Sequence, residues 1–195
     1  MIIKSTQRKR MYFEGDSISY NFAQYLSRTV TTSLISSKGI VSTFDYAVSG
    51  STIADLTTRF ATWGGSIKGG DIIHLWVGTN DIWLSSHSAA TTYSDLCVYA
   101  QLIRNKGAKI VMSTMVARET DATKETTRLA YNALIRGGTG FVFDAIADVG
   151  SDVVFDTSAD TADTTYYVAD RIHPNTVGLD VAATTYIIPA ISSIW

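Results

Sequence analysis

The 195-residue sequence has one cysteine, two prolines and no long charged segment. Cys97 alone cannot form an internal disulfide, so the fold must rely on its hydrophobic core, and a chain of this length can bury a substantial one. No Pro-rich or charged linker divides the sequence, and no repeat has a fixed period. We therefore expect a single domain over residues 1–195, with residues 1–10 as an N-terminal extension.

Charged side chains are also scarce, at 17% of the sequence, whereas soluble domains usually contain about 25%. The surface must therefore be solvated largely by uncharged polar groups. A formal net charge of -2 leaves no excess of Lys and Arg to neutralise phosphates, which argues against nucleic acid as a partner.

No run of apolar residues approaches the ~18 needed for a membrane span. The basic residues before position 11 are not followed by the apolar segment of a signal peptide. We expect a soluble protein without a visible signal peptide, and the sequence leaves its localisation and oligomeric state open. The sequence is also consistent with one domain of a longer extracellular or phage-particle protein.

Signatures of nucleotide and metal sites are missing as well. The pattern GxxxxGK[ST] does not occur, and GxGxxG does not follow the first expected strand. His74, His87 and Asp71 do not have the spacing of metal ligands. We therefore expect neither a cofactor nor a metal.

Short apolar runs alternate with helical patterns along almost the whole chain, which is typical of βα units around a parallel sheet. The expected strands are Met11–Phe13, Ile40–Tyr46, Asp71–Val77, Lys109–Met115 and Gly140–Asp144. The expected helices are Ser19–Ser33, Thr52–Trp63, Ser88–Lys106, Ala122–Arg136 and Pro174–Tyr186.

Two segments carry more specific predictions. In "RLAYNALIR" the helical spacing of Leu129, Ala133 and Leu134 predicts an inward face, with Arg128 and Arg136 turned outward. Residues Ala147–Ala169 lack periodicity and are rich in Asp, Thr and Ser, so they predict a surface excursion before the last helix.

Polar residues follow the expected strands where a parallel sheet binds ligands, at the carboxyl ends. The first strand leads into "GDS" (15–17), the second into "SGS" (49–51) and the third into "GTND" (78–81), while "DRIHPN" (170–175) lies near the C-terminus. Four separate segments thus converge on one edge of the sheet.

These residue types are the ones that serine hydrolysis uses. A serine hydroxyl is a weak nucleophile and needs an adjacent base, which a third group orients. His173 is the natural base for Ser17, and Asp170 can reach the other ring nitrogen from three residues earlier in the same loop. Pro174 suits the first position of the following helix.

Negative charge that develops on an attacked carbonyl oxygen needs preorganised donors. Three donors are available at the same edge. The Ser17 N–H lies at a helix start, the Gly50 N–H lies in a turn without a side chain, and the Asn80 amide projects from the end of the third strand.

In order and spacing, these four blocks resemble those of the SGNH (GDSL-like lipase/esterase) hydrolase family, from Phe13 to about Gly178. The resemblance implies an α/β fold, a three-layer α/β/α sandwich around a flavodoxin-like parallel five-stranded sheet of order 2-1-3-4-5. It further implies ester hydrolysis through an acyl-enzyme without metal. Ser17 corresponds to the nucleophile, His173 to the base and Asp170 to its orienting acid, with Ser17, Gly50 and Asn80 as the oxyanion hole.

Simpler interpretations exist for each block. Ser17 can serve as the N-cap of the helix that follows it. Asn80 and Asp81 can form an Asx turn. Asp170 can be a solvated loop charge and His173 a capping residue.

The function we expect is a serine esterase that hydrolyses small acyl esters, acetyl in particular, with an O-acetylated glycan as the plausible substrate. The first alternative is a thioesterase or lysophospholipase that accepts longer acyl chains. The second is a catalytically silent carbohydrate-binding module of a tail-fibre or surface protein. A flavodoxin-like nucleotide binder is a more distant third.

Overall fold

A five-stranded parallel sheet forms the centre of the computed structural model, which describes residues 9–29, 40–119, 121–138 and 140–194. Its strands are β1 (Lys9–Gly15), β2 (Ile40–Asp45), β3 (Ile72–Trp76), β4 (Lys109–Ser113) and β5 (Ala145–Ala147). They lie in the order β2-β1-β3-β4-β5, and every neighbouring pair is parallel. This confirms the expected sheet and its order.

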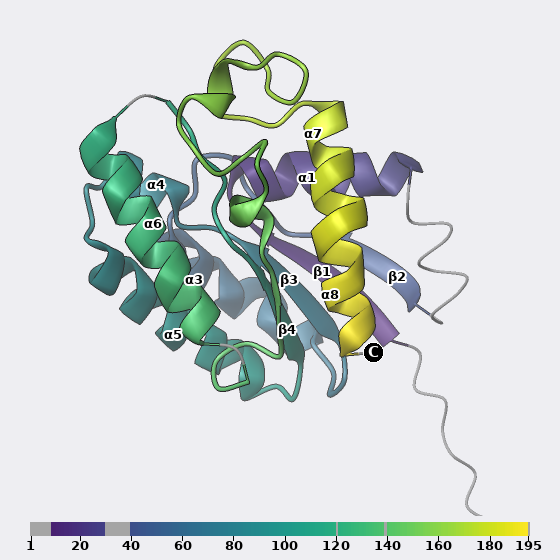
Figure 1. Ribbon diagram of the computed structural model, residues 1–195. Helices are drawn as coiled ribbons and strands as arrows, with labels where there is room; N and C mark the ends of the chain where they lie inside the picture. Colours follow the sequence, from purple (N-terminus) through teal and green to yellow (C-terminus); the bar gives the residue numbers. More distant parts are fainter. Residues whose placement is uncertain (1–8, 30–39, 120, 139, 195) are drawn as a thin grey trace, which may run out of the picture.

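Helices cover both faces of the sheet and give three layers (Figure 1). Helix α1 (Ser17–Thr29) lies beside α7 (Thr176–Val181) on one face, and a π-helical segment, Ala182–Ile187, joins α7 to α8 (Ile188–Ser193) on the same face. The other face carries α3 (Ile53–Trp63), α5 (Ala89–Arg104) and α6 (Ala122–Gly137), and a short helix α4 (Thr79–Trp83) follows β3. Short 3-10 helical turns lie at Gly64–Ser66, Val149–Ser151 and Asp160–Ala162.

The core consists of two apolar clusters, one on each face of the sheet. Alternate residues of each strand enter opposite clusters, because successive side chains of a strand point to opposite faces. Phe13 and Trp76 pack toward α1 and α7, whereas Tyr12 and Leu75 pack toward α3 and α5. All five residues of β3 are buried, as expected of a central parallel strand.

The expected strand Gly140–Asp144 was placed too early in the sequence. The backbone of Gly140 has φ +80, and Phe141 is 85% exposed, so this segment forms turns instead of a strand. The Asp144 N–H donates to the Ile110 carbonyl, and the pairing of β5 with β4 follows from there.

The last helix also begins later than expected. Pro174 forms an isolated antiparallel bridge with Tyr167, and Asn175 caps α7 by accepting hydrogen bonds from the Val177 and Gly178 N–H groups. Pro174 therefore does not occupy the first helical position. Strand β1 begins at Lys9, two residues before the expected Met11. Residues 1–8 of the expected N-terminal extension and the expected helix end at Ser33 lie outside the described residues.

The prediction for α6 was wrong at Arg128. This side chain is fully buried, whereas Leu129 is 48% exposed. Arg128 pairs with Glu125 at 2.5 Å and donates to the carbonyls of Met115 and Asp156 at 2.8 and 2.6 Å. Ala133 and Leu134 are exposed as well, so the face predicted to point inward points outward, and the buried face of α6 carries Arg128, Tyr131, Asn132 and Ile135. Phe155 and Thr161 of the expected surface excursion are also buried.

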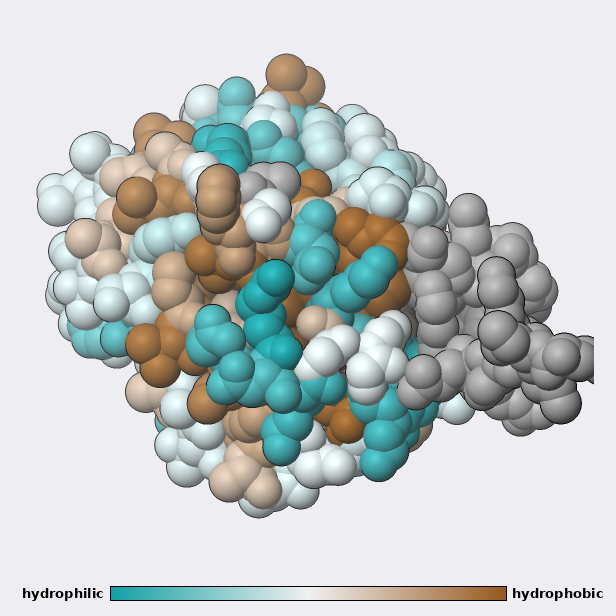
Figure 2. Space-filling view, turned by 90° about the horizontal axis from the view of Figure 1, so that it is seen from below, coloured by the Kyte–Doolittle hydropathy of each residue, from teal (hydrophilic) through white to brown (hydrophobic). Residues whose placement is uncertain are grey.

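The edge of the molecule at which α8 ends is seen from below in Figure 2. Hydrophilic residues gather near the middle of this face, and hydrophobic residues lie in separate groups around them. Among the described helices, none has the length and apolar character needed to cross a membrane.

Replacing Arg128 with Met should lower the free energy of unfolding by about 3 kcal/mol or more, because Glu125 and two carbonyls lose a buried charged donor. Urea denaturation measures the change. The control is Arg136→Met on the same helix, which breaks a half-exposed pair with Asp148 and should cost about 1 kcal/mol or less. Equal losses for the two variants would contradict the structural role of Arg128.

Candidate active site

Ser17 lies where β1 turns into α1, at the carboxyl edge of the sheet. The turn requires glycine at position 15, because its φ is +150 and an added Cβ would lie 2.1 Å from the Trp76 carbonyl oxygen. The Gly15 carbonyl accepts a hydrogen bond from the Val48 N–H at 3.1 Å, which holds the second block against the first.

Asp16, and not Ser17, caps α1. The Asp16 Oδ1 accepts a hydrogen bond from the Ile18 N–H at 2.9 Å, and its carbonyl accepts one from the Tyr20 N–H. Ser17 is the first residue of the helix, and its Oγ lies 2.7 Å from His173 Nε2. The interpretation of Ser17 as a helix cap was therefore wrong.

His173 and Asp170 form one compact loop that faces Ser17. His173 Nδ1 lies 2.6 Å from Asp170 Oδ2, while Asp170 Oδ1 accepts hydrogen bonds from the Ile172 and His173 N–H groups. Burial acts to raise the pKa of Asp170, but the hydrogen bonds from the His173 side chain and these two N–H groups outweigh it and lower the pKa. Asp170 is thus held as an anion next to the imidazole.

The loop is anchored on both sides. The Val168 N–H donates to the His173 carbonyl, and the Arg171 N–H donates to the Val168 carbonyl, both at 3.0 Å. Tyr167, which precedes the loop, is buried and donates its hydroxyl to the Ala117 carbonyl at 2.9 Å. Arg171 adopts φ +61, a conformation that such surrounding contacts must maintain.

The second and third blocks are joined through side chains of α4. Gly50 adopts φ +81 in a turn closed by the Ser51 N–H and the Val48 carbonyl. Asn80 Nδ2 donates to the Ser51 carbonyl at 3.0 Å, and Asp81 accepts from the Ile53 N–H at 3.1 Å. Asn80 and Asp81 lie in a short helix, and their side chains bind the neighbouring segment of Ser51 and Ile53. A simple Asx turn does not describe this arrangement.

Charged side chains lie unusually deep around this turn. Asp16 is 2% exposed, and burial raises its pKa to about 7 despite the hydrogen bond from the Ile18 N–H. The nearby Asp81 raises the Asp16 pKa further, whereas Arg118 lowers it. Arg118 itself is 7% exposed and stacks over the Trp83 ring at 5.2 Å.

Sequence reasoning missed three charged residues of this region: Glu14, Arg59 and Arg118. Glu14 and Arg59 form an ion pair at 2.7 Å, and the Glu14 side chain is completely buried. The only sequence signal was a carboxylate directly before the "GDS" block, inside an otherwise apolar strand.

His74 is not part of the group of Ser17, His173 and Asp170. His74 is fully buried, its Nε2 lies 2.8 Å from Ser113 Oγ, and burial lowers its pKa to about 3, so the ring is neutral. This confirms the interpretation of His74 as a core residue. Within the described residues, no group of three or more His, Cys, Asp or Glu side chains is placed to bind a metal ion.

The sheet order, the helical layers and the side chains gathered at the carboxyl edge together define an SGNH-type hydrolase fold. The model of the GDSL-like Lipase/Acylhydrolase family matches residues 13–181. The chain belongs to this family, and the protein is therefore a carboxylic ester hydrolase. A comparison of the sequence with curated proteins gave no match.

Solved structures share the fold at low sequence identity. A GDSL-like lipase from Bacteroides thetaiotaomicron superimposes with a TM-score of 0.74 and 16% identity, over 100% of this chain and 93% of that chain. A mutant of a Geobacillus acetyl-xylooligosaccharide esterase superimposes with a TM-score of 0.67 and 15% identity, over 94% of this chain and 94% of that chain. A mutant acetyl esterase with acetate ion superimposes with a TM-score of 0.68 and 18% identity, over 95% of this chain and 97% of that chain.

The elevated pKa of Asp16 predicts the pH dependence of an Asp16→Asn variant. Because the folded-state pKa of about 7 exceeds the ordinary value of 3.8, Asp16 contributes stability at low pH that is lost as pH rises through 7. The neutral amide can still accept from the Ile18 N–H. The variant should therefore gain stability relative to the parent between pH 5 and pH 8, measured by urea denaturation.

Asp55→Asn is the matched control for this measurement. Hydrogen bonds from the Thr52 backbone and side chain lower the pKa of Asp55, so its contribution is lost only as pH falls below 3.8. Its stability relative to the parent should stay constant between pH 5 and pH 8. If the stability of Asp16→Asn relative to the parent also stayed constant between pH 5 and pH 8, the explanation by a buried carboxyl group would be contradicted.

Proposed function

We propose that this protein is a serine esterase that removes acetyl groups from an O-acetylated carbohydrate through an acyl-enzyme on Ser17. The observation that carries the proposal is the hydrogen-bonded row of Ser17, His173 and Asp170, with distances of 2.7 and 2.6 Å. Each side chain stands at the spacing that nucleophile, base and orienting acid require.

The first step is attack on the ester carbonyl. Asp170 accepts a hydrogen bond from the Nδ1–H of His173, which leaves the Nε2 lone pair directed at the Ser17 hydroxyl. As Ser17 Oγ bonds to the carbonyl carbon, its proton passes to Nε2. The imidazolium that forms is stabilised by the Asp170 carboxylate.

The carbonyl oxygen becomes an oxyanion in this step, and we assign its donors to the N–H groups of Ser17 and Gly50 and the Asn80 amide. Ser17 is the first residue of α1, so its N–H has no acceptor within the helix. Asn80 has one acceptor among the described residues, the Ser51 carbonyl, so the second Nδ2 hydrogen can serve a ligand.

The intermediate collapses when His173 Nε2 returns the proton to the leaving alcohol oxygen, and the bond from carbon to that oxygen breaks. Water then enters, and His173 takes its proton while the hydroxide attacks the acyl carbon. The proton returns to Ser17 Oγ, which regenerates the serine and releases the carboxylic acid.

A pocket lined by several polar side chains supports a carbohydrate as the alcohol part. It has a volume of about 410 Å³, borders Gly50, and is open to solvent. Its polar lining consists of three hydroxyls, a carboxylate and a guanidinium: Ser49, Ser51, Thr58, Asp55 and Arg59. Such groups suit a polyhydroxylated ligand. The fold is shared with proteins described as acetyl esterases, which supports a small acyl group.

Exposed apolar side chains near the same blocks favour a second candidate, an acyl hydrolase for longer chains. Tyr20 and Val48 are 41% and 46% exposed, and each lies within three residues of Ser17 or Gly50. Val168 and Val177 flank the His173 loop and are 40% and 51% exposed. Together they would provide contacts for a hydrocarbon chain.

Replacing Ser17 with Ala should lower the hydrolysis of p-nitrophenyl acetate by roughly 10⁴-fold or more, because the nucleophile is lost. Covalent labelling by a fluorophosphonate probe should disappear in the same variant. Ser66→Ala, at an exposed turn before β3, is the control and should retain both activities. A parent protein that binds acetylated oligosaccharides but takes up no probe would instead favour the silent binding module.

The length of the acyl group separates the two candidate substrates. For the acetyl esterase, kcat/KM should fall steadily from C2 to C12 p-nitrophenyl esters, and the protein should release acetate from O-acetylated oligosaccharides. A maximum at C8 to C12 without acetate release would favour the longer-chain hydrolase.

A further inference from the structure

Glu14 occupies a position where a charged side chain is costly. It is the next-to-last residue of β1, which pairs with β2 on one side and β3 on the other, and its side chain is 0% exposed. Central parallel strands usually carry apolar residues here, since burial of a carboxylate is unfavourable without a partner. Ser17 follows only three residues later.

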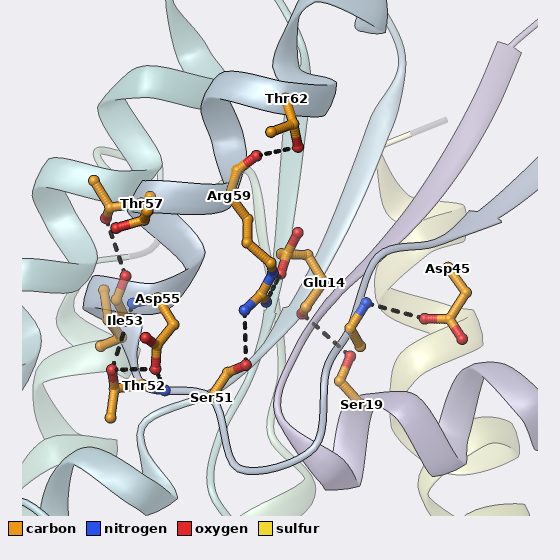
Figure 3. A network of polar contacts seen from close by, with 12 residues as sticks. Glu14, Ser19, Asp45, Ser51, Thr52, Ile53, Asp55, Thr57, Arg59 and Thr62 are labelled. Atoms are coloured by element: carbon orange, nitrogen blue, oxygen red, sulfur yellow. Dashed lines mark hydrogen bonds and ion pairs between the residues drawn. The ribbon is translucent and has the colours of Figure 1, made fainter.

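Arg59 of α3 is the ion-pair partner of Glu14, and it also contacts Ser51. Its Nη2 donates to Glu14 Oε1 at 2.7 Å, and its Nη1 donates to Ser51 Oγ at 2.8 Å. Figure 3 shows the Arg59 side chain extending from α3 toward both Glu14 and Ser51. One guanidinium thus connects the strand before Ser17 with the residue after Gly50.

Ser51 is held from three directions as a result. Its N–H donates to the Val48 carbonyl, its carbonyl accepts from Asn80, and its hydroxyl accepts from Arg59. Because Ser51 adjoins Gly50, these contacts restrain the turn that carries the Gly50 N–H.

The ion pair is not an efficient way to stabilise the fold. Glu14 Oε2 and Arg59 Nε are buried and find no hydrogen-bond partner among the described residues. A buried pair that is incompletely satisfied contributes little or negative stability compared with apolar side chains. Its position between the two blocks therefore calls for a functional explanation.

We propose that Glu14 and Arg59 are positioning residues, which orient the Gly50–Ser51 turn so that the Gly50 N–H meets the oxyanion. The inference rests on the proposed function, because it concerns the oxyanion hole of that reaction. Neither side chain needs to touch the substrate for this role; Arg59 acts through the Ser51 hydroxyl.

Arginine is suited to this task because its planar fork holds two acceptors at once. A lysine at position 59 would keep the charge but could not present two N–H groups in the same geometry. The oxyanion exists only in the transition state and intermediate, so misplacement of the Gly50 N–H should lower kcat and leave KM nearly unchanged.

The protonation of Glu14 gives a further readout. Burial raises its pKa to about 7, although Arg59 lowers it. Asp45 at the end of β2 adds a small upward effect, and Tyr99 of α5, whose own pKa burial raises well above 10, faces the pair as a neutral group. Protonation of Glu14 replaces the ion pair with a weaker hydrogen bond and should loosen Arg59.

The test compares Glu14→Gln, Arg59→Lys and Ser51→Ala on p-nitrophenyl acetate. Each should lower kcat on the order of 10-fold to 100-fold with little change in KM. The effects of Glu14→Gln and Ser51→Ala on kcat should be less than additive in the double variant, since both act through Arg59.

The chain provides a matched control at the opposite end of β1. Arg10 pairs with Asp71 at 2.6 Å, and the side-chain exposures of 23% and 3% resemble the 26% and 0% of Arg59 and Glu14. Arg10→Lys and Asp71→Asn break an equivalent pair far from Ser17. They should lower the melting temperature without lowering kcat.

The pH profile of kcat distinguishes positioning from a general loss of structure. The parent should lose activity below pH 7 more steeply than one ionisation predicts, because protonation of Glu14 adds to protonation of the base. In Glu14→Gln the fall should follow a single ionisation.

Loss of the parental activity in Ser17→Ala would leave the proposed function intact. With that result in hand, any of three further results would overturn the inference. They are an equal loss of kcat in the Arg10 and Asp71 controls, an effect of the three variants on KM or melting temperature alone, and an unchanged pH profile in Glu14→Gln. If the parent hydrolyses no ester, the inference falls together with the proposed function.

Discussion

The contact between Ser17 and His173 is the constraint on which the rest of the site depends, since it joins residues 156 positions apart. It requires the C-terminal helices to return across the sheet and lie beside α1. Leu179 and Ala182 of this returning segment share an apolar cluster with Phe22 of α1, and Tyr25 of α1 donates to Asp180 at 2.5 Å. Packing of these helices thus sets the distance between the two side chains.

The same edge of the sheet concentrates buried charge. Glu14, Asp16 and Asp81 lie within a few residues of Ser17 or Asn80, and burial raises the pKa of each carboxyl. Nearby cations offset the cost only in part. Two apolar clusters enclose the sheet on both faces, and the free energy gained by burying them offsets the remaining unfavourable free energy of the buried carboxyl groups.

Much of this arrangement could be predicted from the sequence. The polar blocks after β1, β2 and β3 pointed to one edge, because parallel strands end together, and the family resemblance supplied the sheet order. The buried face of α6 was misassigned because a charged residue suggests solvent exposure, whereas Arg128 is buried on the face of Tyr131 and Ile135 and pairs with Glu125. Strand β5 was misplaced because the turn around Gly140 contains the apolar Phe141 and Val142. Glu14 and Arg59 were missed because residues 45 positions apart reveal their pairing only in three dimensions.

The turn at Gly50 has two kinds of support, and they differ in what they do. Asn80 donates to the Ser51 carbonyl and, in the proposed reaction, also to the oxyanion, so its substitution would remove a proposed donor and a support at once. Arg59 contacts the same residue through its hydroxyl and donates nothing to the reacting atoms in this scheme. Arg59 lies on α3 and Asn80 on α4, and they contact Ser51 through its hydroxyl and its carbonyl respectively, so Arg59 can be replaced without removing a proposed oxyanion donor. The placement of the Gly50 turn can accordingly be altered through Arg59 while every proposed donor remains present.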